Sequence, residues 1–252
     1  MRSTFFEKNI QYQIEIDGEI WSQGQNISGE LRLRNMSTSV VSLKSINLTI
    51  AHGVKKLMKE KNELGWEIHE NLILKKNISL SNEKEESFKW SLNLKTDCPI
   101  TDKNGGLFLL FGDENVLSKG GRIDLKIKLH PLLQNFLQTF TTQFRFLEKY
   151  QKRKDDWTEV KLLPPESKEF PNLDSVICRI RIKKEKIEVN YSFKMKGIRR
   201  SGQQMKITKK NREFIQTIEK QHYLLPGGFP NRICFRENID LALNTARPEV
   251  IF

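Results

Sequence analysis

Cysteine is scarce in this 252-residue sequence, and long apolar runs are missing from it. The three cysteines, Cys98, Cys178 and Cys234, are odd in number and far apart, which fits neither a disulfide framework nor a paired metal site. We therefore expect them to be reduced core residues. The longest unbroken apolar run, Leu107–Phe111, is far shorter than the roughly 20 residues that span a bilayer, and no apolar signal core follows Met1. We expect a cytoplasmic protein.

Sequence motifs for phosphate, metal or nucleophile chemistry are missing as well. The four histidines are scattered, with no spacing that would let them share a metal ion. No glycine-rich phosphate loop and no Gly-x-Ser-x-Gly elbow occurs. Cys98, directly before Pro99, could act as a nucleophile only with a histidine partner, which the sequence does not place. We therefore expect no catalysis, no metal and no cofactor, and these absences favour a binding protein.

Positive charge is in excess, and the excess lies mainly in the second half of the chain. Residues 1–130 contain 19 Lys and Arg against 17 Asp and Glu, a net charge of +2. Residues 131–252 contain 24 against 14, a net charge of +10, and residues 178–212 alone contain 13 basic and 2 acidic residues. This asymmetry suggests two units with different surroundings and an anionic partner for the second. The alternative is a lysine-rich composition that only keeps the protein soluble.

The first half alternates apolar and polar residues in short runs separated by turn residues, which is the pattern of half-buried strands. One apolar face consists of Ile10, Tyr12, Ile14 and Ile16. Similar faces occur in residues 27–33, 88–94 and 123–129. Because no helical period of useful length lies between these runs, we predict an antiparallel β-sandwich rather than a parallel sheet.

The apolar period changes at Pro131. From Leu132 onward, apolar residues recur every three or four positions, which predicts a helix of about four or five turns. Because the charge balance changes at the same point, we interpret residues 132–150 as a connector helix packed between two units. The predicted domains are 1–131, an N-terminal sandwich, and 132–252, the connector helix with a basic C-terminal sandwich. A helix inside one larger domain is the alternative.

Strand patterns resume beyond the connector. Apolar residues alternate with polar ones in residues 178–183 and again in residues 187–195. The intervening Lys184-Glu185-Lys186 predicts that these two runs form a hairpin. A second helical pattern is predicted near residues 214–218, before a Pro- and Gly-rich breaker, and the last twenty residues are weakly patterned.

Four short stretches resemble a known protein family, in the family's own order. Ile27-Ser28-Gly29 resembles the arrestin-type opening, in which a turn and an Ile/Val-x-Gly precede the second strand. Phe88-Lys89-Trp90 with the later Cys98-Pro99-Ile100-Thr101 resembles a Phe-x-Phe/Trp strand that leads to Pro-Ile-Thr. Residues 123–131 resemble the last strand of a first domain, and Leu173-Asp174 resembles a pair that precedes a second-domain hairpin. Together they look like the bacterial arrestin-like proteins of the sporulation-control (stage zero, M) type.

The resemblance covers about residues 8–196 and implies two arrestin-like β-sandwiches with a regulatory, non-catalytic role through protein contacts. The predicted fold is therefore mainly β, with two arrestin-like antiparallel β-sandwiches and a connecting helix. The sequence departs from the family pattern where Ser175 follows Asp174 in place of an acidic residue. It departs again where Lys194-Met195-Lys196 replaces a charged pair, so the resemblance does not identify the partner.

We predict a scaffold or adaptor whose first domain offers sheet edges and whose second domain presents basic charge to an acidic protein partner. Unpaired edge strands also predict a homodimer formed by strand addition. A nucleic-acid-binding protein is the second hypothesis, although aromatic residues are not interleaved on the basic face as stacking on single strands requires. An anionic membrane surface ranks with nucleic acid below an acidic protein, and an enzyme is the third hypothesis.

The predicted binding site is a set of cations on the second-domain hairpin: Arg179, Arg181, Lys183, Lys194, Lys196, Arg199 and Arg200. Strand alternation places the first three opposite the apolar Cys178 and its neighbours. Adjacent strands about 4.8 Å apart would hold these cations within a Debye length of one another, a repulsion that an anionic partner would relieve. A solvated lysine-rich face is the alternative.

Overall fold

The computed structural model describes residues 1–59, 65–201 and 204–247, with side chains described for all of these except residues 59 and 197–208. The chain divides into two units, Met1–Lys128 and Leu129–Phe252. The boundary predicted from the sequence follows residue 131. Each unit has its own buried core.

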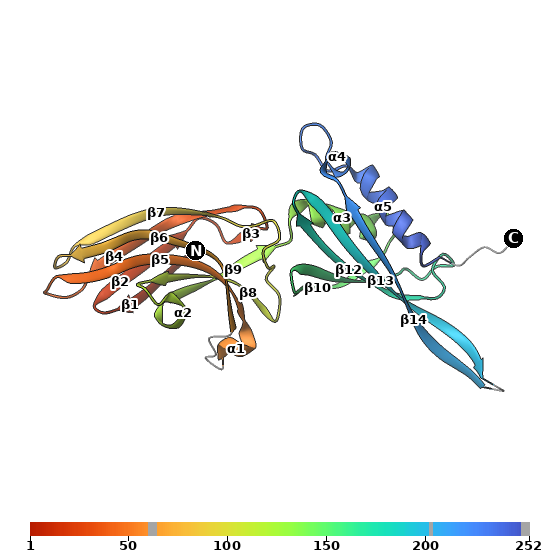
Figure 1. Cartoon of the computed structure of the whole chain (residues 1–252), viewed down its shortest axis with the longest axis horizontal. Coiled ribbons are helices and arrows are strands. Elements are labelled where there is room, and N and C mark those ends of the chain that lie inside the picture. The colour runs from red at the N-terminus through yellow and green to blue at the C-terminus, as the bar shows by residue number, and fades with distance from the viewer. Residues whose placement is uncertain (60–64, 202–203, 248–252) are drawn as a thin grey trace. The chain divides into compact units, whose positions relative to one another are not determined.

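The first unit consists of two packed sheets and two short helices (Figure 1). Its elements are β1 (Arg2–Glu7), β2 (Ile10–Ile16), β3 (Ile20–Ser22), β4 (Asn26–Asn35), β5 (Val41–Val54), α1 (Lys55–Lys59), β6 (Trp66–Leu80), β7 (Glu85–Asn93), β8 (Gly105–Gly112), α2 (Val116–Lys119) and β9 (Gly121–Lys128). One sheet has the order β1-β2-β4-β7 and the other the order β3-β9-β8-β5-β6. Only β3 and β9 pair in parallel among the described strands. The sandwich predicted for this half is confirmed.

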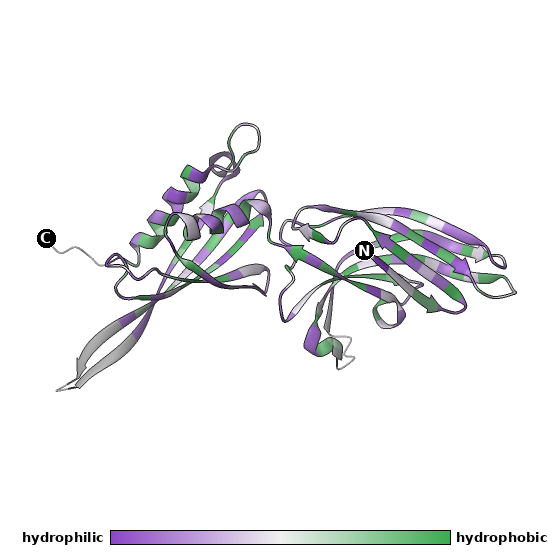
Figure 2. Cartoon of the chain, turned by 180° about the vertical axis from the view of Figure 1, so that it is seen from behind, coloured by the Kyte–Doolittle hydropathy of each residue, from purple (hydrophilic) through white to green (hydrophobic). Residues whose placement is uncertain are grey.

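Alternation along each strand decides which side chains enter the core of the first unit. The four apolar residues of β2, from Ile10 to Ile16, are buried, and the residues between them are more exposed. They join one apolar cluster to which both sheets contribute, including Leu31 and Leu109. Figure 2 shows hydrophobic and hydrophilic residues alternating along these strands. Each such side chain stabilises the fold by about 1.5–3 kcal/mol when it is fully buried.

Two of the short motifs in this unit have a direct structural reason. Gly29 lies where β4 passes close to the backbone of β2 and to the ring of Trp90, so a Cβ atom there would clash with both. The hydroxyl of Thr101 donates to the carbonyl oxygen of Leu125 at 2.8 Å and accepts from the backbone N–H of Ile127 at 2.9 Å. The glycine therefore permits close strand packing, and the threonine ties the loop after β7 to β9.

The second unit contains one sheet with helices on one of its faces. Its elements are α3 (Pro131–Thr142), β10 (Leu147–Lys154), β11 (Trp157–Leu163), β12 (Leu173–Lys183), β13 (Lys186–Ser201), β14 (Gln204–Ile218), α4 (Lys220–Tyr223) and α5 (Arg232–Asn244). The five strands are antiparallel neighbours in chain order, from β10 to β14. Figures 1 and 2 show α3 and α5 side by side next to this sheet. We call the sheet face toward these helices the inner face and the opposite one the outer face.

Aromatic residues form the contact between the helices and the inner face. The ring of Phe136 lies 5.4 Å from that of Phe235 of α5, and the ring of Phe140 lies 6.3 Å from that of Tyr191 of β13. All four side chains are buried. The mainly β, antiparallel fold is thus confirmed, but the layer that faces this sheet is helical in the described residues, where we expected a second sheet. Large rings on α3 and α5 cover the inner face in its place.

The connector helix is shorter than predicted, because its apolar spacing continues into a strand. α3 ends at Thr142, and Leu147, which we assigned to the helix, begins β10. Between them Arg145 adopts a φ of 57°, in the left-handed region that interrupts a helix. The burial expected for this segment is present, since Phe140 is fully buried within the second unit.

Two features near the end of the chain also differ from the sequence prediction. The helix predicted near residues 214–218 is wrong, because these residues belong to β14 and Phe214 and Ile218 share its inner face. α5 lies in the stretch that we read as weakly patterned, and Asn231 caps it by accepting a hydrogen bond from the N–H of Cys234 at 3.2 Å. Within the described residues, no helix has the length and apolar character needed to cross a membrane.

Candidate partner-binding surface

The cations predicted on β12 and β13, as far as their side chains are described, lie on the outer face of the sheet of the second unit. Cys178, Ile180 and Ile182 of β12 are buried on the inner side, and the intervening Arg179 and Arg181 lie on the outer side. The register places residue 179 opposite residue 190 of β13, and the chain continues with exposed Lys194 and Lys196 on the same outer side. The facing predicted from alternation is therefore confirmed for these described side chains.

Carboxylates from neighbouring strands neutralise part of this row. Arg179 lies 3.0 Å from the carboxylate of Glu159 on β11, and Lys196 lies 2.7 Å from that of Asp174. Arg181 also bonds to a carboxylate, that of Glu188 at 2.7 Å. The guanidinium group of Arg181 stacks on the ring of Trp157 at 4.0 Å. The repulsion that we expected an external anion to relieve is therefore largely relieved inside the sheet.

Glu159 is the centre of the tightest charge cluster on the outer face. Its residue is only 6% exposed, and its carboxylate also lies 3.0 Å from Nζ of Lys152 and accepts from the hydroxyl of Tyr150 at 3.2 Å. Burial favours the neutral acid, but the hydrogen bonds from Lys152 and Arg179 outweigh it and lower the pKa of Glu159. In return, the hydrogen bond to Glu159 raises the pKa of Lys152. The cluster is thus a fixed internal salt network at neutral pH.

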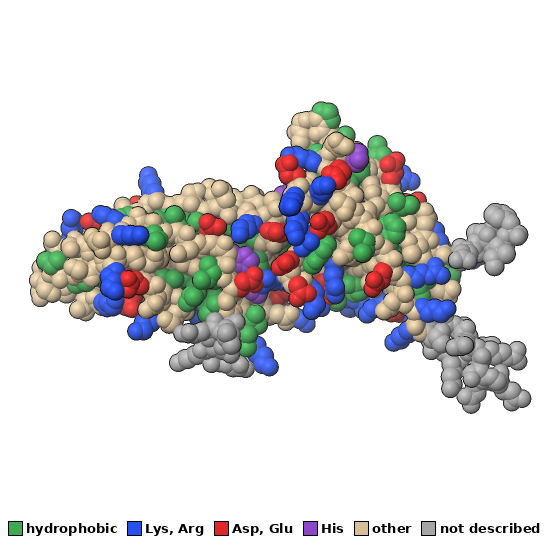
Figure 3. All heavy atoms as spheres, viewed as in Figure 1, with side chains coloured by type: hydrophobic (Ala, Val, Ile, Leu, Met, Phe, Trp, Pro, Cys, Tyr) green, Lys and Arg blue, Asp and Glu red, His purple; other side chains and the backbone are tan. Residues whose placement is uncertain are grey.

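A groove with a volume of about 490 Å³ lies on the outer face beside this network. Ile177 and Ile215 form apolar parts of its lining, and the carboxylate of Glu213 and the ammonium of Lys194 lie on its walls. Ile215 is 71% exposed and gives the groove an apolar side chain that is open to solvent. Figure 3 shows cationic and anionic side chains mixed on one face of this unit. The groove can therefore hold a chain with both apolar and charged groups.

Lysines that form no ion pair within the described residues lie on the outer face beyond the Glu159 cluster. Lys161, Lys194 and Lys209 form no ion pair within the described residues. The hydrogen bond from Lys196 lowers the pKa of Asp174, and Lys161 and Lys209 add to this effect through their charge, so one carboxylate faces three lysines. Lys183 is likewise exposed and without an ion pair in the described part of the chain. Of the predicted residues, Arg179, Arg181 and Lys196 are thus paired with carboxylates, whereas Lys183 and Lys194 are not, and Lys161 and Lys209 were missed.

β13 and β14 continue beyond the rest of the sheet as a two-stranded ribbon (Figure 1). The pairing of β12 with β13 ends at residues 173 and 195, whereas that of β13 with β14 continues to residues 201 and 204. The sequence from 196 to 210 has six basic residues and no acidic one. The side chains of Arg199 and Arg200, which we predicted as site residues, lie outside the described side chains. The second strand of this ribbon was missed, because its continuation in β14, residues 214–218, was predicted to be a helix.

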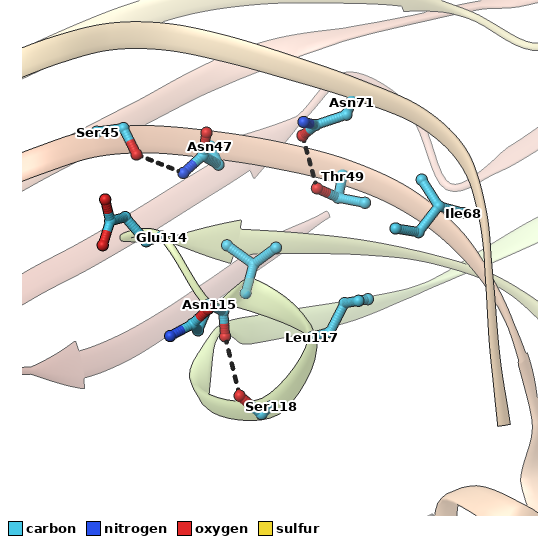
Figure 4. A pocket seen from close by; sticks show the side chains of 10 residues that line it. Ser45, Asn47, Thr49, Ile68, Asn71, Glu114, Asn115, Leu117 and Ser118 are labelled. Carbon is cyan, nitrogen blue, oxygen red and sulfur yellow. Dashed lines mark hydrogen bonds between the residues drawn. The ribbon is translucent and has the colours of Figure 1, made fainter. Parts of the chain in front are cut away.

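A second groove, of about 560 Å³, lies in the first unit between β5, β6 and α2 (Figure 4). Its polar side chains bond to each other. Asn47 donates to the hydroxyl of Ser45 at 2.7 Å, and the hydroxyl of Thr49 donates to Asn71 at 2.9 Å. The charged Glu114 of its lining is tied to Lys44 at 3.1 Å. Sequence analysis gave no signal for this groove, and its internal pairing leaves little charge for a ligand.

The cysteines are buried and free, as we expected from their spacing. Burial raises the pKa of Cys98 to about 12. Burial also raises the pKa values of Cys178 and Cys234. Because the thiolate is the reactive form, these thiols are poorly suited to nucleophilic chemistry at neutral pH.

Comparison with known proteins gives a match in fold over nearly the whole chain. No family model matches the sequence, and no curated protein matches it. The chain is similar to the crystal structure of Spo0M, the sporulation control protein from Bacillus subtilis, with a TM-score of 0.64 and 11% identity over 94% of this chain and 99% of that one. The arrestin-like sporulation-control resemblance is therefore confirmed at the level of the fold.

Two other solved structures are similar over about half of the chain. One is the Pseudomonas fluorescens alkylpurine DNA glycosylase AlkC bound to DNA with an abasic site analogue, with a TM-score of 0.32, 11% identity, and coverage of 47% of this chain and 30% of that one. The other is a CARDB domain of a Pyrococcus furiosus protein in complex with di-metal ions, with a TM-score of 0.27, 10% identity, and coverage of 50% and 95%.

Proposed function

We propose that the protein is a non-catalytic, cytoplasmic regulatory adaptor, whose second unit binds an acidic segment of a protein partner on the outer face of its sheet. The observation that carries this proposal is Lys194 on the wall of an open groove, with Lys161 and Lys209 on the same outer face and no ion pair to any of the three within the described residues. The fold shared with a sporulation control protein supports the regulatory part of the proposal.

The composition of the groove supports a peptide rather than a nucleic acid as the ligand. Glu213 and the apolar Ile177 and Ile215 line it together with Lys194. A phosphate backbone would be repelled by the carboxylate and would gain nothing from the isoleucines, whereas a peptide can place acidic and apolar side chains in turn. Trp157 is stacked under Arg181, so its ring is already occupied. Stacking platforms for single-stranded bases need free aromatic faces.

The proposal can be tested with a fluorescent ten-residue peptide of alternating glutamate and valine. The variant Lys194→Glu/Lys209→Glu reverses two cations that form no ion pair, so the sheet keeps its internal pairs. Lys126→Glu/Lys128→Glu is the matched control, because it reverses two exposed lysines of β9 with the same change in net charge. We expect the first variant to bind about tenfold more weakly or worse and the control to bind within about twofold of the parent.

Salt and a competing polyanion complete this test. Binding by the parent should weaken between about 20 and 150 mM salt, because exposed charges are screened. Equal peptide binding by the parent and both variants would overturn the proposal. Tighter binding of a single-stranded DNA of equal charge than of the peptide would favour the nucleic-acid hypothesis in its place.

A further inference from the structure

Edge strands of the two units differ in how well they are protected against pairing with another chain. β6 has two register shifts and the adjacent Lys75 and Lys76, and β10 has one shift and several lysines. β3 has three residues and β1 has six, and the nine residues of β7 include Glu85, Glu86 and Lys89. Bulges, short length and edge charges are the usual devices that prevent strand addition. These five edges are therefore guarded.

β14 is the exception. It pairs with β13 over fifteen consecutive positions without a register shift, and it is the last strand of its sheet among the described residues. From Phe214 to Ile218 it contains no charged residue, no proline and no glycine. Its exposed Ile215 has a β-branched side chain that favours a strand. An edge with continuous pairing behind it and an uncharged stretch over residues 214–218 is a template for another strand.

The surroundings of this edge indicate what could pair with it. Lys209, Lys210 and Arg212 precede the uncharged stretch and are exposed, with Glu213 the one acidic residue among them. The guanidinium group of Arg212 donates to the carbonyl oxygen of Thr245 at 2.7 Å, whereas Lys209 and Lys210 form no ion pair within the described residues. A strand added here would meet positive charge at one end and Ile215 next to it. A segment that contains both acidic and apolar residues complements this edge.

We propose that the free edge of β14 over residues 211–218 binds an extended acidic peptide segment as a sixth strand of the sheet. This proposal rests on the proposed function, because it says how the acidic partner would be held. Main-chain hydrogen bonds to β14 supply the affinity, the lysines supply attraction, and the side chains of the added strand lie beside Ile215 and the groove.

A second copy of this chain fits the edge less well than an acidic segment. Two copies of β14 paired antiparallel about residue 211 would set Lys210 of each copy opposite Arg212 of the other. Directly opposed like charges destabilise a strand pair. Pairing about residue 213 would oppose two Glu213 side chains and is disfavoured for the same reason. Pairing about residue 215 opposes no like charges, but each copy has a net charge of +12, so a second copy is repelled where an acidic segment is attracted.

Backbone methylation of the same probe peptide tests for strand addition directly. An added strand uses every second N–H group to bond with the edge strand, so only one half of the peptide nitrogens matters. We compare peptides methylated on all valine nitrogens or on all glutamate nitrogens. We expect one of them to bind about tenfold more weakly or worse and the other to stay within about threefold of the unmethylated peptide. Equal affinities for all three peptides, with the dependence on Lys194 and Lys209 retained, would overturn strand addition and leave the proposed function standing.

Protein variants locate the edge. Ile215→Asp should weaken peptide binding about tenfold, because it places a negative charge where the acidic strand would lie. Ile68→Asp is the matched control, since Ile68 is also exposed, at 56%, on the guarded edge strand β6, and it should bind like the parent. Weaker binding by Ile68→Asp alone would overturn the assignment to β14. A concentration-dependent dimer of the parent that Ile215→Asp abolishes would show that a second copy occupies this edge, and would overturn the proposed occupant.

Discussion

In the first unit, two sheets pack against each other through their apolar faces. In the second unit, helices pack on one face of a single sheet and the other face is open. In the first unit, buried residues such as Leu31 and Leu109 from opposite sheets meet in one core. In the second, Phe136 and Phe140 of α3 lie over the inner face, and the outer face is without a covering element in the described residues. A sheet face that no element covers is in contact with water, so its side chains must be ones that are stable when hydrated.

The outer face meets this requirement with charge pairs rather than with simple polar residues. Glu159 forms ion pairs with Lys152 and Arg179, and Glu188 forms one with Arg181. These pairs fix the positions of the three cations across neighbouring strands. The first half of the chain is almost neutral, and the second has a net charge of +10 that these pairs reduce only locally. Where the pairs end, near Lys194 and Lys209, the charge is free to attract a partner. The open face is thus neutral at its centre and positive at its end.

Phe140→Asp should have the largest effect, because it attacks the helical layer that distinguishes the second unit. The side chain is fully buried and its ring contacts those of Phe136, Phe146 and Tyr191. Losing the ring and burying a charge should lower the free energy of unfolding by about 4 kcal/mol or more. Urea unfolding followed by circular dichroism measures this, with Phe229→Asp as a control at a 69% exposed position. Unchanged unfolding of Phe140→Asp would mean that the helices do not pack on the sheet.

Glu159→Gln should have an intermediate effect and should sharpen the contrast between the paired centre and the free end. It leaves Lys152 and Arg179 without their carboxylate, which should cost about 1–3 kcal/mol of unfolding free energy at pH 7. The same change frees two cations, so the acidic peptide should bind more tightly to the variant than to the parent. Asp124→Asn, at an exposed position of β9 in the first unit and without an ion pair within the described residues, is the control for the removal of one negative charge.

The stability difference caused by Glu159→Gln should also depend on pH. The pKa of Glu159 is lower in the folded state than its usual value of 4.5, so the unfolded chain binds the proton more readily. The stabilisation is therefore present above the unfolded pKa and is lost as the pH falls through the lower, folded pKa. The parent and the variant should differ most near pH 7 and should converge toward pH 3 in urea titrations. A difference that stays constant over this range would exclude a charged Glu159 as the source.

Arg181→Lys should have the smallest effect. Lysine keeps the positive charge toward Glu188 but cannot stack a planar guanidinium group on Trp157, and it loses the directional hydrogen bond from Nε. We expect a loss of about 0.5–1 kcal/mol in the free energy of unfolding. Lys183→Arg, at the exposed next outer position of β12, should be neutral in the same assay. A loss as large as that of Glu159→Gln would mean that Arg181 has a role beyond this stacking contact.

Alternation was enough to predict which residues of a strand face outward, but it could not predict their partners. Cys178 and Arg179 were placed on opposite faces because neighbours in a strand always are. Glu159 lies twenty positions from Arg179 in the sequence, and the two meet only because β11 and β12 pair in one particular register. Register depends on turns and packing that the sequence pattern does not contain. The ion pairs between these cations and carboxylates on neighbouring strands could therefore not be predicted from the sequence.

Helices were harder to predict than strands for a related physical reason. Phe214 and Ile218 are four positions apart, which suits one face of a helix and also one face of a strand, and the pairing with β13 settles the choice. α5 buries Phe235 and Ile239 between charged residues, so its apolar stripe is short and its mean hydropathy is low. Its clearest local signal was Asn231, a helix-capping residue directly after Pro230.

Hydrogen exchange of the full-length protein, with and without the glutamate–valine peptide, tests the difference between the two units most directly. Backbone amides of β14 between residues 211 and 218 should exchange more slowly when the peptide is bound, because the amides at the free edge would gain hydrogen bonds. Amides of β6 between residues 66 and 74, on the guarded edge of the first unit, should exchange at the same rate with and without peptide. Protection of β6 instead of β14, or no protection in either strand at saturating peptide, would contradict the assignment of partner binding to the open sheet of the second unit.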